Sequence, residues 1–395
     1  MATPMNGAIV YQGIVASQIA AAPVGVKIVD IYDDNGDLFS TSQVAKMESG
    51  GGELLGYFDI GHAENWRPYW STLPKSILGP GMAGSPGEYQ VAYWASDWLK
   101  VAESYIQTMI DRGYDGAFFD NMGEAETPWA EAHAPQEKAI GAMVDLIQEL
   151  ASYARAKDPS FKIWVNASGD ENMLANSALD KTINGDVEES LFYQAPMSPE
   201  SPSYVAANLK FLDDLIKAGK SVLDVEYISD ASEVASVEAR ARADGMGYYI
   251  AGPDQSLDGV DTQGFRSVTP STVTIAHKTL SVAENGGQVN LDVRVTAPAS
   301  SAATTVTIPS YETITDKLDG KTFSGSSIAL SAAEVDSGLI LTSHYRGGKH
   351  PSAKLTITAR DTIEGFIANS MPQTITVKDP PAPADAPFLI DPLLG

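Results

Sequence analysis

The sequence predicts two domains of different class, an α/β domain built as a closed (β/α)8 barrel and an all-β sandwich after it. The longer first part of the chain alternates apolar, strand-like runs with stretches of helical spacing, whereas the rest contains short Val/Ile/Thr-rich alternations. All six tryptophans lie before residue 269. The net charge of residues 1–268 is −22, whereas that of residues 269–395 is −3. Because 395 residues exceed one ordinary domain, we expect a barrel over 1–268, a sandwich over 269–379 and a proline-rich tail over 380–395.

Eight apolar runs have the length of barrel strands. They cover residues 8–12, 26–32, 54–61, 116–121, 161–167, 185–192, 221–227 and 245–252. Apolar residues recur at helical spacing over 98–110, 139–154, 209–216 and 235–243. A doubly wound open sheet produces the same alternation and is the alternative. No GxGxxG follows the first run and the sequence has no phosphate-binding loop, which disfavours a nucleotide-binding protein.

Seven alternating runs follow the predicted barrel, bounded by Gly, Pro, Asn and Asp. They cover residues 271–282, 288–298, 304–310, 326–332, 338–345, 353–361 and 373–379. This pattern is typical of an antiparallel sandwich. It resembles the Ig-like or cadherin-like modules appended to secreted bacterial enzymes and adhesins, which implies a spacer, or a contact with a glycan or a surface. The segment lacks a DxNDN-type calcium linker, so the sequence assigns no calcium to it.

The charge balance narrows the classes of partner. The chain has 26 Lys+Arg against 51 Asp+Glu, a net charge of −25. This balance disfavours a nucleic-acid-binding protein, which needs a basic surface, and docking on an anionic membrane. No run of eighteen or more apolar residues is present, so we expect no membrane insertion. A neutral or cationic partner fits the charge better.

Cysteine is absent, which excludes disulfides, thiolate nucleophiles and Cys-ligated zinc. The absence of cysteine fixes no compartment, but it suits a protein that leaves the cell without oxidative folding, and we expect an extracellular, secreted protein. The N-terminus has no basic residue before Lys27 and no sustained apolar segment, so it does not have the pattern of a signal peptide. We therefore expect export without a leader, or a leader already removed from this sequence.

Acidic residues follow several predicted barrel strands, at the ends where catalytic groups of such barrels lie. These residues are Asp59, Glu64, Asp120, Asp170, Asp186, Glu188, Glu189, Asp224, Glu226 and Asp230. An Asp-Asn pair such as Asp120-Asn121 is also typical of a helix N-cap or an Asx-turn. Glu188 lies near Val187 and Leu191, which have the pattern of core residues, and a buried unpaired carboxylate is costly, so a functional role is favoured. Asp59 and Glu226 fit either direct chemistry or support of their neighbours.

Two carboxyl groups facing each other across a dry cleft are what glycoside hydrolysis needs. One is protonated and donates to the leaving oxygen, and the other is ionised and attacks the anomeric carbon or activates water. Trp66 and Trp70 follow the third strand and fit platforms for sugar rings, although a loop folded on its own aromatics is the alternative. His62 is the only histidine at a strand end, which disfavours a metal site. We expect no metal and no other cofactor.

Six segments carry a family resemblance. In order, they read GYFDIGHAENWRPYW, LGPGMAGSPGEYQVAYW, GYDGAFFDN, KIWVNAS, DVEESLFY and VLDVEY. Over residues 8–252 they resemble the motifs of glycoside hydrolase family 114, the endo-α-1,4-polygalactosaminidases and related prokaryotic barrel proteins. The resemblance implies Asp120 and Glu188 as the catalytic pair. It implies substrate-binding or supporting roles for Asp59, Glu64, Asn166 and Glu226, and at the same rim we expect substrate contacts from His62, Trp66, Trp70, Asn121, Asp224 and Tyr227.

The sequence thus favours an endo-acting hydrolase of a galactosamine-containing polysaccharide in a biofilm or cell-surface matrix. Polygalactosamine with free amines is cationic, and a barrel with a net charge of −22 attracts it over long range. Added salt screens this attraction. The alternative is a barrel without activity that binds glycan through Trp66 and Trp70, with the sandwich as an adhesive partner. A polysaccharide deacetylase is disfavoured, because it needs a metal on one Asp and two His and the barrel has too few histidines.

Overall fold

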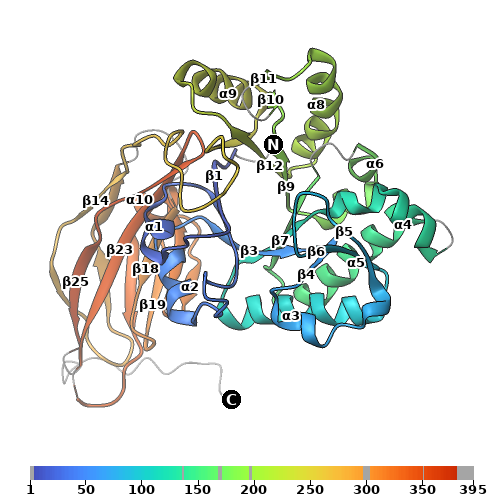
Figure 1. Cartoon of the computed structure of the whole chain (residues 1–395). Coiled ribbons are helices and arrows are strands. Elements are labelled where there is room, and N and C mark those ends of the chain that lie inside the picture. The colour runs from blue at the N-terminus through green and yellow to red at the C-terminus, as the bar shows by residue number, and fades with distance from the viewer. Residues whose placement is uncertain are drawn as a thin grey trace. The chain divides into compact units, whose positions relative to one another are not determined.

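The computed structural model describes residues 4–135, 138–167, 171–194, 198–296, 303–349 and 351–379. The chain divides into two compact units, residues 1–266 with 364–366, and residues 267–363 with 367–395 (Figure 1). The tail predicted over 380–395 lies outside the described residues. Within the described ranges, no helix is both long and apolar enough to cross a membrane.

Eight parallel strands form one sheet in the first unit, paired in the order β1–β2–β3–β7–β8–β9–β12–β13. They are β1 (Gly7–Val10), β2 (Val26–Val29), β3 (Glu53–Asp59), β7 (Gly116–Asp120), β8 (Lys162–Asn166), β9 (Gly185–Glu189), β12 (Ser221–Tyr227) and β13 (Gly247–Ala251). Asn6 Oδ1 accepts the backbone N–H of Tyr248 at 3.1 Å and so joins the two ends of the sheet. The predicted barrel is confirmed as a nearly closed (β/α)8-type sheet, and its sequential strand order contradicts the doubly wound alternative.

Helices alternate with the strands of this sheet (Figure 1). They are α1 (Ala16–Ala21), α2 (Thr41–Glu48), α3 (Ser96–Arg112), α4 (Pro128–His133), α5 (Ala139–Arg155), α6 (Glu171–Leu174), α7 (Ser177–Thr182), α8 (Pro202–Lys217) and α9 (Ala231–Asp244). Local chemistry sets their ends: Asp230 caps α9 by accepting the N–H groups of Ser232 and Glu233, and Gly245 ends it at φ +77°. The apolar face of α3 packs on the outside of the barrel, where Trp98 is fully buried and stacks on Phe58 at 5.6 Å.

A small antiparallel sheet lies between β3 and α3 in the chain, and the sequence analysis did not predict it. It consists of β4 (His62–Glu64), β6 (Glu88–Val91) and β5 (Leu78–Gly81), paired in that order. These strands are short and rich in Gly, Pro and polar residues, so they carry little periodic signal. Because β4 begins two residues after β3 ends, the sheet places His62 and Glu64 at the C-terminal end of the barrel strands.

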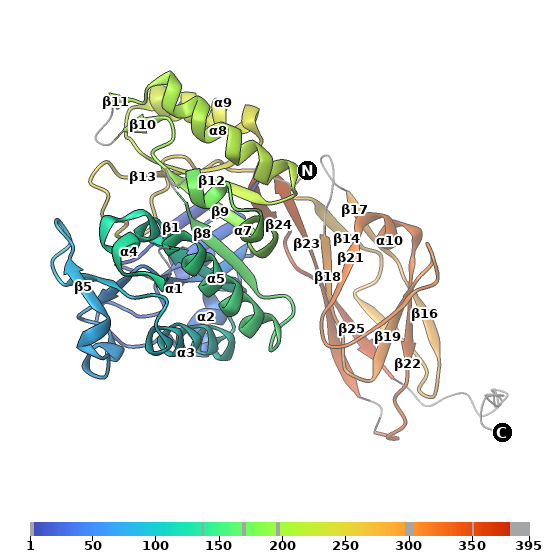
Figure 2. The same ribbon diagram turned by 90° about the vertical axis from the view of Figure 1, so that its right-hand side faces the viewer.

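The second unit consists of β-sheets around a single apolar core (Figure 2). Its strands are β14 (Thr272–Ile275), β15 (Thr279–Ser281), β16 (Gln288–Leu291), β17 (Val293–Thr296), β18 (Ala303–Thr307), β19 (Glu312–Asp316), β20 (Thr322–Ser324), β21 (Ile328–Ser331), β22 (Leu339–Ser343), β23 (Ser352–Ile363), β24 (Phe366–Asn369) and β25 (Gln373–Lys378). Helix α10 (Ala332–Ser337) follows β21. The sheets β15–β25–β23–β18–β21 and β16–β22–β19–β20 both contribute to the core, through residues such as Ile357 and Leu341. The Ig-like assignment stays a prediction.

Candidate active site

Three neighbouring barrel strands end in polar residues that meet. Asp120, Asn166 and Glu189 are the last residues of β7, β8 and β9. Asn166 pairs in register with Val187, and because side chains alternate along a strand, Glu189 points to the same face as Asn166. The Asn166 amide donates to Asp120 Oδ1 at 2.9 Å and also forms a hydrogen bond with Glu189. One amide therefore holds two carboxyl groups, which we call the carboxyl pair.

Two tyrosines lie beside the carboxyl pair. Tyr227, the last residue of β12, donates its hydroxyl to Glu189 Oε1 at 2.8 Å. Tyr11 directly follows β1, and the charges of Asp120 and Glu189 raise its pKa further than burial alone. Its ring lies 4.3 Å from that of Tyr57 on β3. The carboxyl ends of β1, β3, β7, β8, β9 and β12 thus converge on one site inside the barrel, as expected for this fold.

Glu188 does not belong to this group. It precedes Glu189 on β9, so its side chain points to the opposite face, where it is fully buried. There it pairs in register with Asp224 and acts on that residue through its charge. The predicted meeting of Asp120 with Glu188 is therefore contradicted by the structure, since a shift of one residue along a strand changes the face completely.

Asp224 and Glu226 lie with Glu188 on the outer face of the sheet. Both are fully buried, and burial, followed by the charges of Glu226 and Glu188, raises the pKa of Asp224. Glu226 accepts the backbone N–H groups of Phe192 at 2.5 Å and Tyr193 at 3.2 Å. Burial raises the pKa of Glu226 to about 8, against these hydrogen bonds, which lower it. Glu226 thus holds the segment that follows Glu189. Neither of the predicted substrate-binding residues Asp224 and Glu226 faces the barrel interior.

Asp59 orients several groups at the end of β3. Its Oδ1 accepts the backbone N–H groups of Gly61 at 3.1 Å and His62 at 2.8 Å, and its Oδ2 accepts Asn121 Nδ2 at 2.8 Å. The His62 ring lies between Asp59 (Nδ1 to Oδ2, 3.2 Å) and Glu124 (Nε2 to Oε1, 2.9 Å). Burial opposes the charged ring, but Asp59 and Glu124 outweigh it and raise the pKa of His62 to about 10. Asp59, His62 and Asn121 are therefore brought together beside Asp120. Their role in substrate binding stays a prediction.

Asp59, His62 and Glu88 are spaced like ligands of a metal ion. One ligand atom from each lies within 4.8 Å of the other two. With its pKa at about 10, the His62 ring holds both protons at neutral pH and has to release one before a nitrogen can bind a metal ion. The group is better described as an imidazolium held by carboxylates.

Glu64 binds Arg67 in a buried ion cluster. Glu64 Oε2 accepts Arg67 Nε at 2.6 Å, and Arg67 Nη2 lies 2.8 Å from Asp30 Oδ2. All three side chains are nearly inaccessible to water. Both carboxylate oxygens of Glu64 thus bind Arg67. Glu64 therefore has a supporting, structural role at the carboxyl ends of the barrel strands.

The two tryptophans predicted as platforms differ in exposure. Trp66 is 53% exposed and lines a cavity of about 440 Å³, together with Tyr11 and Asp30. Trp70 is covered by its own chain, since Lys75 Nζ lies 3.5 Å from its ring centroid and the Tyr89 ring lies at 5.1 Å. Tyr11 lines this cavity and is close enough to the carboxyl pair for the charges of Asp120 and Glu189 to raise its pKa. Of the two tryptophans, only Trp66 therefore keeps an exposed ring near the pair, and its role as a platform stays a prediction.

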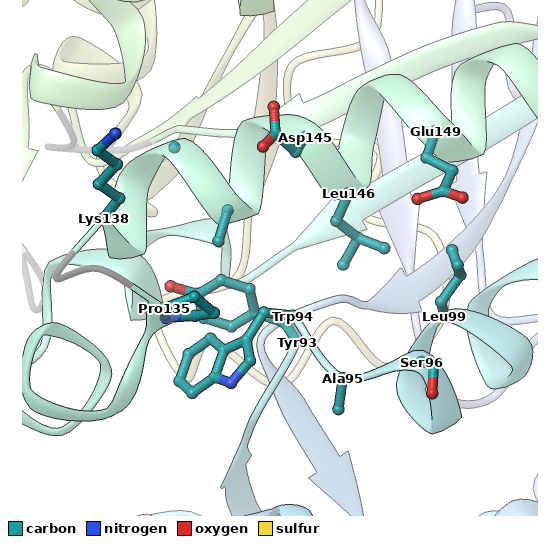
Figure 3. Close-up of a pocket in the computed structure, with 12 residues that line it drawn as sticks. Tyr93, Trp94, Ala95, Ser96, Leu99, Pro135, Lys138, Asp145, Leu146 and Glu149 are labelled. Carbon is teal, nitrogen blue, oxygen red and sulfur yellow. The ribbon is translucent and has the colours of Figure 1, made fainter.

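A cavity of about 520 Å³ lies elsewhere on the barrel unit, between the N-terminal part of α3 and α5 (Figure 3). Trp94 and Leu99 line one side of it, and Leu146 and Glu149 on α5 line the other. None of the predicted site residues lines this cavity.

The environment of the carboxyl pair favours one bound proton. Burial, followed by the charges of Glu189 and Asp59, raises the pKa of Asp120 to about 8, although hydrogen bonds from Asn121 and Asn166 lower it. Burial also raises the pKa of Glu189. Two carboxyl groups this close titrate together. Because the charge of Glu189 raises the pKa of Asp120, Glu189 loses its proton first. Below about pH 8 there is therefore a range in which Asp120 keeps its proton beside the Glu189 carboxylate, which is the protonation state of a general acid with a nucleophile or base.

Sequence reasoning did not select Glu189, Tyr11 or Tyr57 as site residues. A usable signal existed for Glu189, because Asp120 and Asn166 each end an apolar run and Glu189 holds the corresponding terminal position in its own strand. The two tyrosines gave no signal, since an aromatic residue in an apolar run is typical of core.

Comparison with known proteins identifies the family of the barrel unit. The family model for glycoside-hydrolase family GH114 matches residues 5–267. An uncharacterized protein of Thermotoga maritima is 27% identical over 256 residues, covering 61% of this chain and 78% of its own length. One from Methanocaldococcus jannaschii is 28% identical over 262 residues, covering 62% and 75%.

Two solved structures share the fold of the barrel unit. The first is Aspergillus fumigatus Ega3 in complex with galactosamine, with a TM-score of 0.52 at 17% identity, covering 66% of this chain and 96% of that one. The second is the glycoside hydrolase domain of PelA from Pseudomonas aeruginosa, with a TM-score of 0.52 at 13% identity, covering 64% and 96%.

Proposed function

Because the chain belongs to glycoside-hydrolase family GH114, whose model matches residues 5–267, we propose that it cleaves an amino-sugar polysaccharide with Asp120 and Glu189 as its catalytic carboxyl groups. The observation that carries the proposal is the Asn166 amide, which binds both carboxyl groups at the ends of strands inside the barrel.

The spacing of the pair supports a retaining reaction. One Asn166 side chain contacts both carboxyl groups, so the pair lies close together. A close pair, with a separation of about 5–5.5 Å, is typical of retaining glycosidases, whereas inverting enzymes hold their carboxyl groups farther apart. In the first step the protonated carboxyl group gives its proton to the glycosidic oxygen, the other carboxylate bonds to the anomeric carbon, and the glycosidic bond breaks. In the second step water attacks the same carbon, the carboxylate leaves, and the proton from water returns to the first carboxyl group.

The neighbours of the pair support this chemistry. The Tyr227 hydroxyl fixes the orientation of Glu189, and the Asn121 backbone N–H fixes Asp120 at 2.9 Å. Asp59 holds the Asn121 side chain in turn. Preorganised donors of this kind reduce the cost of orienting charge in the transition state.

An amino sugar fits the charge of the barrel. Residues 1–268 have a net charge of −22, and this charge attracts a cationic, deacetylated polymer. Ega3, which shares the fold, is described in complex with galactosamine. Trp66 and Tyr11 offer aromatic surfaces, and Asp30, Asp33 and Asp34 supply carboxylates along the same cavity.

A glycan panel tests the proposal. We expect the full-length protein to release oligosaccharides from deacetylated galactosamine polymers, detected by mass spectrometry, and to do so more slowly as salt is added. The Glu189→Gln variant serves as the inactive control. Binding to such polymers without any released product would show a glycan-binding barrel without activity, and release from neutral polymers alone would exclude an amino-sugar substrate.

The pH dependence follows from the raised pKa of Asp120. We expect kcat/KM to fall as the pH rises through about 8, because the carboxyl pair then loses the proton needed by the leaving group. The measurement is kcat/KM across the neutral and alkaline range, with thermal melts at each pH to confirm folding. An activity that stays constant well above pH 8 would contradict this role of the pair.

A further inference from the structure

The second unit contains its own pair of buried carboxyl groups, Glu312 and Asp379. Glu312 is the first residue of β19, and Asp379 directly follows β25. Their exposed fractions are 1% and 0%. None of the four carboxyl oxygens has a hydrogen-bond partner within the described part of the chain. Buried acids are normally paired or hydrogen-bonded, because a charged group without a partner loses its hydration and gains no interaction that compensates for the loss.

The two carboxyl groups lie close enough to act on each other. Burial and then the charge of Asp379 raise the pKa of Glu312 to about 8, and both acids act on the neighbouring Tyr311 hydroxyl. Backbone hydrogen bonds fix the surrounding loops: His344 N donates to Tyr311 O at 2.8 Å, and Asp379 N donates to Pro351 O at 3.2 Å. The pair therefore occupies a fixed place at one end of the sheets.

Neutralising this pair requires either a proton or a cation. No cationic side chain lowers the pKa of Glu312. A proton shared between the two groups would form a hydrogen bond between them, yet none of their four oxygens has a hydrogen-bond partner within the described residues. A cation between the two groups satisfies both acids at once.

We propose that Glu312 and Asp379 bind a divalent cation of the Ca²⁺ type in the second unit. Ca²⁺ is bound by oxygen ligands alone and accepts carboxylates in one- or two-oxygen contact together with backbone carbonyls. Such an ion ties the end of β25 to the start of β19. The ligands lie far apart in the chain, which explains why the sequence shows no calcium motif.

Terbium luminescence tests the site in the full-length protein. Tb³⁺ substitutes for Ca²⁺, and Tyr311 lies beside Glu312, so tyrosine excitation is expected to sensitise bound Tb³⁺ and added Ca²⁺ to quench it by displacement. The Glu312→Gln/Asp379→Asn variant is expected to lose this signal, and Glu312→Gln alone to weaken binding at least about tenfold. Asp292→Asn, an exposed acid of the same unit, and Glu88→Gln in the barrel are controls that should retain it.

Thermal unfolding separates loss of the site from loss of the fold. Ca²⁺ is expected to raise the unfolding temperature of the wild type, relative to EDTA. In EDTA the double variant should unfold at a higher temperature than the wild type, because two repelling acids have been removed, and it should not respond to Ca²⁺. An equal Ca²⁺ response in the two proteins, or no Ca²⁺ and no Tb³⁺ response in the wild type, would overturn the proposal. These readouts do not depend on glycan hydrolysis.

Discussion

Glu189→Gln is expected to lower kcat on the order of 10³-fold, whereas the neighbouring Glu188→Gln keeps it within about tenfold. The first change removes a carboxyl group that accepts from Tyr227 and Asn166 inside the barrel, and the second changes a side chain buried on the outer face. Asp120→Asn should match Glu189→Gln in effect.

The two glutamates form a matched pair, since they are adjacent on one strand and differ only in the face they occupy. Kinetics on the same polymer, with melting curves to show that both variants are folded, measure the difference. If Glu188→Gln lost as much kcat as Glu189→Gln while folded, the assignment of the pair would be wrong.

Arg67→Ala is expected to destabilise the barrel unit by about 3–5 kcal/mol. The Arg67 guanidinium is buried and neutralises Glu64 and Asp30 at 2.6 and 2.8 Å, so its removal leaves two carboxylates without a partner and out of water. Lys100→Ala is the control, because Lys100 forms an exposed pair with Asp97 and should cost less than about 1 kcal/mol. Denaturant unfolding gives both values, and an Arg67→Ala loss as small as that of the control would show that the cluster contributes little.

The barrel was predictable because its strands are buried on both faces and read as continuous apolar runs. All eight predicted runs overlap the eight strands of the sheet. The same property conceals which side chains point into the barrel, because a strand buried on both faces shows no alternation of apolar and polar residues. The choice between Glu188 and Glu189 depends on where β9 ends and on its register with β8, which no local pattern reveals.

Other features depend on contacts between distant segments. The cover on Trp70 comes from Lys75 and Tyr89, and the protonated state of His62 depends on Glu124, far along the chain. The pairing of Glu312 with Asp379 is likewise a product of the folded sheets. Composition and spacing identified Asp59, Asp120 and Asn166 because each ends a strand, and strand ends are the part of a barrel site that a sequence shows best.

A crystal structure of the Glu189→Gln variant with a bound galactosamine oligosaccharide tests the account most directly. The predicted result is a glycosidic bond lying between position 189 and the Asp120 carboxyl group, with the anomeric carbon about 3–3.5 Å from an attacking oxygen. Sugar units are expected to continue past Tyr11 toward Trp66. An oligosaccharide seated only in the cavity between α3 and α5, with the ends of β7 and β9 left without sugar, would contradict the account.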